Sequence, residues 1–355
     1  MRLICYLAPN QHQEVMALIG TKAAEGSFLR NFECLYPPPD NIFTQEVSDS
    51  FNLSLDTGRD ILLIDPTEYP AYEAIVTYCM YSRKIPVYVC SGHGHEKHEI
   101  QSKLIQDHPL LEIGERSRLG HFLRSFTDSG KLISFEGGDG VGKQTQTAHM
   151  KKKLEEMGHV VKTMDFPHDA AACGKLIRQV LRGDFGTIQE IHPILFASLY
   201  GYNRADMKGI LLYWLRRGYI VLLDRYVEAN YGHQLSKLNS EEEQSVLLNA
   251  LVSFEHEWLG LPRSHIVLYL DLPPQVAASA LALDTTRKAL DIHESAVSNY
   301  KEKVRSTFLW CSEQLKNWRV VKCLRVAEIE GHPDIRLSVE EVHTLCIEHV
   351  LSIID

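Results

Sequence analysis

The segment FEGGDGVGKQTQT, Phe135 to Thr147, decides the fold of the larger part of this chain. Gly137 is followed after four residues by the pair Gly142-Lys143, which is the spacing of a phosphate-binding loop. Such a loop brings backbone N–H groups close to phosphate oxygens, which requires glycine where a Cβ atom would collide. The helix predicted to start at Lys143 directs its positive end toward the phosphates, and Lys143 adds a mobile positive charge.

A second motif, VLLDRY at residues 221 to 226, supports a phosphoryl-transfer site. Asp224 ends an apolar predicted strand, where a magnesium-organising carboxylate is expected beside a phosphate loop. Arg225 follows it, and a guanidinium can hold a phosphate through two hydrogen bonds. Without the phosphate loop, a salt bridge at the end of a strand would be the simpler interpretation. With the loop, we expect both residues to be catalytic.

The residue after Lys143 departs from the usual pattern. A serine or threonine hydroxyl normally stands there to hold magnesium, but this chain has Gln144, followed by Thr145. Because Mg²⁺ keeps several water ligands and binds largely through substrate phosphates, the loss of one hydroxyl need not abolish metal binding. We therefore expect a working enzyme with Mg²⁺ as cofactor, bound by Asp224 and Gln144 and held partly through water.

The whole chain has the composition of an ordinary folded protein. Its 355 residues are 45% hydrophobic and 23% charged, which allows two domains with substantial cores. A net charge of −9 argues against a nucleic-acid partner, which would need a basic surface. The eight cysteines form no Cys-x-x-Cys pair, and no signal peptide or membrane-spanning stretch is visible. We expect a cytoplasmic protein without a membrane partner.

Short β-branched runs alternate with longer helical patterns, which is typical of α/β folds with parallel sheets. We predict a P-loop nucleotide kinase at residues 129–355, with a five-stranded parallel sheet formed by KLISFEG, HVVKTMDFP, YIVLLDRY, HIVLYLDLP and WRVVKCL. Residues 1–128 are predicted to form a smaller Rossmann-like α/β domain with strands RLICYLA, DILLIDP and IPVYVCS. A helix is predicted around GERSRLGHFLRSF, before the boundary near Ser129.

The ordered motifs from about Leu132 to Asp355 resemble the thymidylate kinase family, whose members transfer phosphate from ATP to dTMP. FEGGDGVGK resembles the phosphate loop of that family, DFP the segment after its second strand, LYGYNR its thymine-binding helix, and DRYVEANYGHQ its Asp-Arg-Tyr segment. The resemblance implies ATP as phosphate donor, Mg²⁺ as cofactor, dTMP as acceptor and a role in dTDP biosynthesis. It also implies a homodimer.

The resemblance assigns residues to the donor site and to catalysis. The loop that would bind ATP comprises Gly137, Gly138, Asp139, Gly140, Val141, Gly142, Lys143, Gln144 and Thr145. The catalytic residues would be Lys143, Asp139, Arg225, Asp224 and Arg287. Arg287 belongs to TTRKALDIHE, which resembles a short lid from which an arginine or lysine approaches the transferring phosphoryl group.

The resemblance also assigns residues to the acceptor site, namely Phe166, Tyr200, Arg204, Arg225, Asn230 and His233. Tyr200 would stack on thymine and Arg204 would bind its O4 atom, and the two lie one helical turn apart on one face. His168 stands where many family members have an arginine for the acceptor phosphate. Either Arg225 carries that role alone, or Lys175 or Arg178 assists.

The first domain resembles the nucleoside 2-deoxyribosyltransferase-like fold. LICYLAP resembles its opening strand, and DILLIDPTEYPAYEAIVTYCMYSRKIPVYV its strand–helix–strand segment. The catalytic glutamate of that family would fall near Val76, with Glu73 one turn earlier, and an upstream aspartate near Asn52. We expect a regulatory or degenerate relative, used for regulation, dimerisation or substrate sensing, rather than an active transferase.

Alternatives to a dTMP kinase stay open at this point. The protein would be a kinase for another deoxynucleoside monophosphate if the base and sugar contacts, which spacing does not settle, select a different acceptor. It would be a non-catalytic nucleotide-binding module if Gln144 and His168 mark a lost activity. The joint presence of Lys143, Asp224 and Arg225 favours a working kinase.

Overall fold

The computed structural model divides the chain into two compact units. It describes residues 2–6, 31–34, 60–64, 72–82, 84–91, 108–115, 118, 121–122, 125–171, 173–187, 190–282, 298–325 and 334–354. Unit 1 comprises Met1–Ser129 together with Gly209–Gly218, and unit 2 comprises Gly130–Lys208 and Tyr219–Asp355. Within the described ranges, no helix is long and apolar enough to cross a membrane.

Unit 2 is built on a five-stranded parallel sheet, which confirms the predicted fold class. Its strands are β6 (Lys131–Glu136), β7 (Val161–Asp165), β8 (Ile220–Asp224), β9 (Ile266–Asp271) and β10 (Trp318–Lys322). The order across the sheet is β10-β9-β6-β8-β7, and every neighbouring pair is parallel. The central strand β6 is buried from Leu132 to Glu136. Covering on both faces explains why side chains of both faces, among them Leu132, Ile133 and Phe135, are buried.

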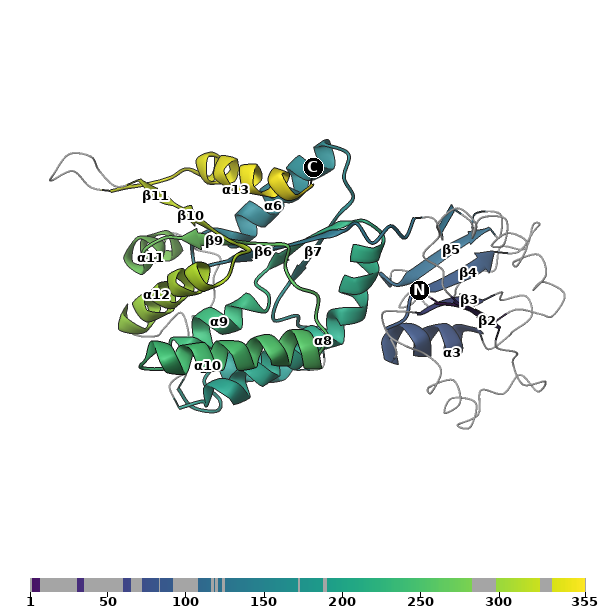
Figure 1. Ribbon diagram of the computed structural model, residues 1–355, viewed down its shortest axis with the longest axis horizontal. Coiled ribbons are helices and arrows are strands. Elements are labelled where there is room, and N and C mark those ends of the chain that lie inside the picture. Colours follow the sequence, from purple (N-terminus) through teal and green to yellow (C-terminus); the bar gives the residue numbers. More distant parts are fainter. Residues whose placement is uncertain are drawn as a thin grey trace. The chain divides into compact units, whose positions relative to one another are not determined.

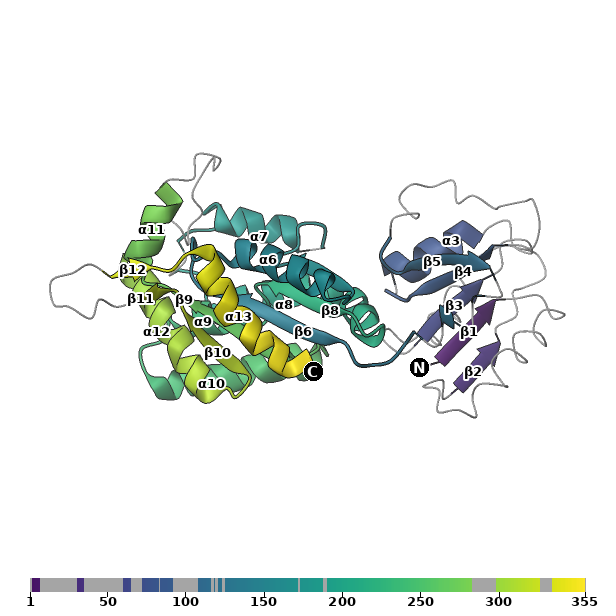
Figure 2. The same cartoon turned by 90° about the horizontal axis from the view of Figure 1, so that it is seen from above.

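Helices cover both faces of this sheet (Figure 1). The helices α6 (Lys143–Glu156) and α13 (Val339–Ile354) lie side by side on one face, and α9 (Glu228–Leu235) and α12 (Ser298–Gln314) lie on the other. Seen from above, α13 runs beside α6 across the strands (Figure 2). The other elements of this part are α7 (Gly174–Leu181), α8 (Pro193–Arg216), α10 (Glu241–Val252), the π-helix η4 (Ser253–Trp258), α11 (Pro274–Ala282), and the antiparallel strands β11 (Leu324–Arg325) and β12 (Ile335–Arg336).

Helical spacing explains which residues form the core between the sheet and the helices α6 and α13. Val342, Cys346 and Val350 recur every fourth residue along α13 and are buried together with Met150 and Leu154 of α6. Side chains at this spacing lie on one face of a helix, and that face packs on the sheet. The packing holds α6, whose first residue is Lys143, directly behind the phosphate loop.

On the opposite side, α9 and α12 approach closely at Gly232. A Cβ atom at this position would lie 2.2 Å from the ring of Phe308, so glycine is required for the contact. The Phe308 ring is fully buried and stacks on Tyr269 with ring centroids 5.0 Å apart, which leaves it little room to move. Because α9 carries Asn230 and His233, this contact fixes the position of two predicted acceptor residues.

Unit 1 contains a second five-stranded parallel sheet. Its strands are β1 (Arg2–Tyr6), β2 (Asn31–Cys34), β3 (Asp60–Ile64), β4 (Val87–Ser91) and β5 (Leu111–Glu115), in the order β2-β1-β3-β4-β5. Helix α3 (Tyr72–Thr77) continues into the π-helix η2 (Tyr78–Ser82) and connects β3 with β4. The three predicted strands are present, and β2 and β5 are additional.

The helix predicted around GERSRLGHFLRSF is wrong at its start, because Gly114 and Glu115 belong to β5. The strand has the sequence LEIGE, which contains few of the residues that favour strands. It forms at the edge of the sheet and pairs with β4 alone, so pairing rather than propensity determines its conformation. A Cβ atom at Gly114 would lie 2.3 Å from the hydroxyl oxygen of Tyr88, so a larger residue here would require the Tyr88 side chain to shift.

Unit 1 also includes the end of α8 and the turn after it. Arg217 donates a hydrogen bond to Glu112 at 2.8 Å, and its guanidinium lies 5.2 Å from the ring centre of Phe122. Tyr213 packs against Phe126 with ring centroids 5.9 Å apart. Unit 1 is therefore not one continuous stretch of the chain.

Candidate active site

The loop between β6 and α6 has the backbone conformation of a phosphate-binding loop. Gly137 has a φ of +144°, and a Cβ atom there would lie 2.8 Å from the carbonyl oxygen of Leu270, so no other residue fits. Gly142 has a φ of +100° and precedes α6 without a side-chain cap. The first N–H groups of α6 are therefore not used by a capping side chain, and such groups bind anions.

Lys143 lies across this loop. Its Nζ atom donates hydrogen bonds to the carbonyl oxygens of Gly138 at 2.8 Å and Gly137 at 3.2 Å. Burial, and then the charge of Arg225, lower the pKa of Lys143 to about 8, against the opposing effect of nearby carboxylates. A phosphate bound in the loop would replace these two carbonyl partners and favour the charged ammonium.

Asp224 and Arg225 emerge beside the loop because β8 pairs directly with β6. Asp224 stands opposite Phe135 in the register, at the carboxyl ends of both strands. Arg225 has a φ of +66°, which is uncommon outside glycine and is found disproportionately at functional sites. Its guanidinium donates to the carbonyl oxygen of Gly137 at 3.2 Å and forms an ion pair with Asp139. Arg225 is therefore tied to the loop by direct contacts, and strand pairing places Asp224 beside it.

A cavity of about 180 Å³ adjoins the loop. It brings together eight of the predicted site residues, namely Asp139, Phe166, Tyr200, Arg204, Asp224, Arg225, Asn230 and His233. Gln144 and Thr145 lie in the first turn of α6 with exposed side chains. Arg287 lies outside the described residues.

Aromatic side chains line the end of the cavity formed by α8 and by the residues after β7. The ring of Tyr200 lies 5.1 Å from that of Phe196, and the guanidinium of Arg204 lies 6.0 Å from the centre of the Tyr200 ring. Phe166 packs against Tyr226 with ring centroids 5.8 Å apart. This end offers flat apolar surfaces beside a charged fork of donors, which suits a planar base with a polar edge.

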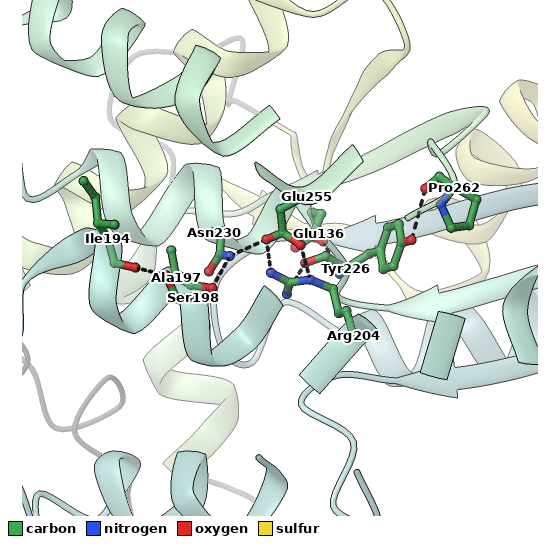
Figure 3. Close-up of polar contacts among 9 residues, drawn as sticks. All are labelled: Glu136, Ile194, Ala197, Ser198, Arg204, Tyr226, Asn230, Glu255 and Pro262. Atoms are coloured by element: carbon green, nitrogen blue, oxygen red, sulfur yellow. Dashed lines mark hydrogen bonds and ion pairs between the residues drawn. The ribbon is translucent and has the colours of Figure 1, made fainter. Parts of the chain in front are cut away.

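Glu255, which the sequence analysis did not identify, holds Arg204 in place (Figure 3). Both carboxylate oxygens accept hydrogen bonds from the guanidinium, and one of them also accepts from the side-chain amide of Asn230 at 2.6 Å. Arg204 and Glu255 are 1% and 0% exposed, so the ion pair is fully buried. No sequence motif marks Glu255, because it is a single acidic residue in a predicted helical region.

A second buried carboxylate, Glu136, lies at the start of the loop. Its Oε1 atom accepts a hydrogen bond from the N–H of Tyr226 at 2.7 Å. Burial, and then the neighbouring Glu228, raise the pKa of Glu136 to about 8. Glu228 in turn accepts a hydrogen bond from Ser134 at 3.3 Å. These contacts join β6 to the segment after β8 behind the site.

The structure distinguishes the basic residues considered for the acceptor phosphate. Arg178 lines the cavity, with its Nε atom donating to Asp169 at 2.7 Å. Lys175 has an exposed side chain. The backbone N–H and C=O of His168 are both bonded to the side chain of Asn203, at 2.8 and 2.9 Å. Of these three residues, only Arg178 lines the cavity together with Arg225.

A glycine loop after the central parallel strand, an Asp-Arg pair on the adjacent strand and an adjoining cavity define the class of P-loop nucleotide kinases. The sequence model of the family described as thymidylate kinase matches residues 135–325, more than half of the chain. The thymidylate kinase of Clavibacter sepedonicus is 33% identical over 51% of this chain and 81% of its own length, and that of Bifidobacterium longum (strain DJO10A) is 34% identical over 51% and 83%. The chain belongs to the thymidylate kinase family.

The thymidylate kinase of Danio rerio is 26% identical over 62% of this chain and 94% of its own length. A solved thymidylate kinase from Candida albicans shares 22% identity over 64% of this chain and 94% of its own, with a TM-score of 0.46, which adds nothing to the assignment. Family membership confirms the predicted resemblance of the second part of the chain to thymidylate kinases and the predicted class, an ATP-dependent nucleotide kinase.

We expect Lys143→Ala to lower kcat for phosphoryl transfer by roughly a hundredfold or more, because its ammonium is the group held across the loop where phosphates bind. Steady-state ADP release measures the change. Lys152→Ala, which removes an 81% exposed lysine side chain from the same helix, is the matched control and should behave like the unaltered protein. Normal turnover in Lys143→Ala would show that this loop is not the donor site.

Proposed function

We propose that the protein transfers the γ-phosphoryl group of ATP to dTMP and produces dTDP. The observation that carries the proposal is that one cavity is lined both by Asp139 of the phosphate loop and by Arg204 and Asn230. A nucleotide acceptor laid along it would place its phosphate by Arg225 and its base by Tyr200. The relatives that match this chain are thymidylate kinases by name, which supports dTMP as the acceptor.

On the donor side, the loop from Gly137 to Thr145 cradles the phosphates of ATP. Backbone N–H groups and the charge of Lys143 neutralise the phosphate oxygens, and Arg225 stabilises the negative charge that spreads over the transferring group. Positioning and electrostatics supply most of the catalysis in this reaction class, so a rigid loop tied to Arg225 suits it.

We propose Mg²⁺ as cofactor, with Asp224 and Gln144 as the residues that hold it. Asp224 is a half-buried carboxylate that lines the cavity, and Gln144 offers an amide oxygen at the first turn of α6. The described part of the chain contains no group of three or more His, Cys, Asp or Glu side chains suited to a metal. This sparse donor set fits Mg²⁺, which binds chiefly through water and phosphates. When bound, the ion neutralises charge on the donor phosphates.

On the acceptor side, Arg225 and Arg178 bind the monophosphate, and Asp139 and His233 lie by the sugar. His233 is held between Arg225, with Nε2 3.4 Å from Nη1, and Tyr300, with Nδ1 3.3 Å from the hydroxyl. A ring fixed in this way crowds a 2′-hydroxyl and favours deoxyribose. The base stacks on Tyr200 and presents its polar edge to Arg204 and Asn230.

We also propose a homodimer and a cytoplasmic location. Large apolar side chains are exposed on α8, α10 and η4, namely Ile194, Leu195, Tyr202, Val246 and Trp258. Tyr202 and Trp258 both pack against Phe254, with ring centroids 6.1 and 6.4 Å apart, and exposed apolar groups that lie together favour a protein–protein contact. The cysteines whose state the structure describes are free, and most are buried, which suits a reducing compartment.

We propose that residues 1–128 form a regulatory or degenerate relative of the deoxyribosyltransferase-like fold.

We expect the purified protein to release ADP fastest with dTMP, more slowly with dUMP, and poorly with dCMP and UMP. An arginine N–H donates to the carbonyl oxygen at C4 of thymine and uracil, whereas it opposes the amino group at C4 of cytosine. Arg204→Ala should lower kcat/KM for dTMP by at least roughly tenfold and change the low dCMP rate little. Faster turnover of dCMP or of a purine monophosphate would contradict the assignment of the acceptor.

We expect Gln144→Ser to retain or raise activity and to lower the Mg²⁺ concentration needed for half-maximal rate, because a small hydroxyl is a better direct ligand than an amide. Gln144→Ala, which removes the oxygen altogether, is the matched comparison and should need more Mg²⁺. Magnesium titrations of ADP release distinguish the two. A severe loss in Gln144→Ser would mean that the glutamine has another role.

A further inference from the structure

We infer that Glu255 is a positioning residue that fixes the hydrogen-bond polarity of the base site, so that it accepts a thymine and rejects a cytosine. Glu255 lies on η4, an element that follows α10 and directs this carboxylate into the interior. The inference rests on the proposed function, because it takes the end of the cavity at Arg204 and Asn230 as the place of the base.

The contacts of the Asn230 amide determine which of its two ends faces Glu255. Its Nδ2 atom donates to Glu255 Oε1 at 2.6 Å and to the backbone carbonyl of Ala197 at 3.2 Å. Both partners can only accept, so they can be satisfied only by the NH₂ end of the amide. The two acceptors therefore fix which end of the amide faces them. The opposite end, Oδ1, has no donor within hydrogen-bond reach among the described residues, and Asn230 lines the cavity.

The contacts of Arg204 determine the orientation of its guanidinium. Its Nε atom donates to Glu255 Oε2 at 2.9 Å, Nη1 donates to the carbonyl oxygen of Tyr226 at 3.1 Å, and Nη2 donates to Glu255 Oε1 (Figure 3). A guanidinium carries five N–H groups in a fixed plane, so these contacts determine where the remaining two point. Arg204 and Asn230 are buried and both line the cavity. We assign the remaining N–H groups of Arg204 as the donor toward the base, and Oδ1 of Asn230 as the acceptor.

These two groups match only one kind of pyrimidine edge. Thymine presents an acceptor at O4 and a donor at N3–H, whereas cytosine presents a donor at N4 and an acceptor at N3. A site with one fixed donor and one fixed acceptor satisfies both groups of thymine and opposes both groups of cytosine. A buried donor or acceptor without a partner costs about 1–3 kcal/mol, which corresponds to a discrimination of roughly five- to 150-fold for each contact.

Glu255 makes the shorter of the two contacts that keep the acceptor in place, at 2.6 Å against 3.2 Å for the carbonyl of Ala197. An amide can turn by half a rotation and exchange its two ends, which would present a donor to the base. As long as Glu255 Oε1 faces Asn230, that turn would place two acceptor oxygens against each other. Removing the carboxylate would leave the carbonyl of Ala197 as the remaining constraint among the described contacts.

The test compares dTMP with 5-methyl-dCMP, which keeps the methyl group and changes only the polar edge. Glu255→Met removes both acceptor oxygens, and the ratio of kcat/KM for dTMP to that for 5-methyl-dCMP should fall by at least about tenfold. Glu255→Gln removes the charge but keeps one oxygen for Asn230, so it should lower both values and preserve most of the ratio. Glu257→Met, on the exposed side of the same element, is the matched control and should leave the ratio unchanged.

The outcomes separate the inference from the function on which it rests. If the unaltered protein does not prefer dTMP to 5-methyl-dCMP, the proposed base site is wrong. If it does, and folded Glu255→Met keeps the same ratio, the inference about Glu255 is wrong.

Should Glu255→Met fail to fold, amide hydrogen exchange in the unaltered protein tests the same point. The side-chain NH₂ signal of Asn230, assigned by its loss in Asn230→Asp, should be protected from solvent. Rapid exchange of both hydrogens would overturn the inference.

Discussion

Burial of the Arg204 guanidinium is the constraint on which the acceptor end of the site depends. Arginine does not lose its proton, so a fully buried arginine must be surrounded by acceptors or the fold is heavily destabilised. Glu255 and the carbonyl of Tyr226 supply them, and each belongs to a different element from α8. Satisfying one charge thereby joins α8, η4 and the segment after β8 around the cavity. The same contacts determine the direction in which the remaining N–H groups of Arg204 point.

The donor end depends on the sheet rather than on a buried ion pair. Parallel pairing of β6 with β8 brings the phosphate loop and Asp224 to the same edge, and Arg225 reaches back to the carbonyl of Gly137. The two ends meet along α9, which begins shortly after Arg225 and carries Asn230 and His233. Close packing of Gly232 on Phe308 sets the height of α9 above the sheet. A nucleotide that fills the cavity is thus held between a backbone loop and a buried ion network.

Sequence and structure agree where local pattern decides the outcome. The sequence predicts strands β6 to β10 from their apolar runs and the phosphate loop from the glycines around Gly137. Both predictions succeed because burial and backbone conformation restrict each of these positions separately. The residues that the structure adds depend on contacts distant in sequence. Glu255 meets Arg204 across 51 residues, and the cavity that selects Arg178 over Lys175 exists only after folding. The edge strand β5, with a glycine and two glutamates, shows the same limit, since its pairing partner determines its conformation.

The most direct test of the account is a crystal structure of the protein with dTMP bound. The account predicts that thymine O4 lies within hydrogen-bond distance of the Arg204 guanidinium and that N3 lies within reach of Asn230 Oδ1. The ring should stack on Tyr200, and the phosphate should contact Arg225. A base bound elsewhere, or one whose N3 faces the NH₂ end of Asn230, would contradict it.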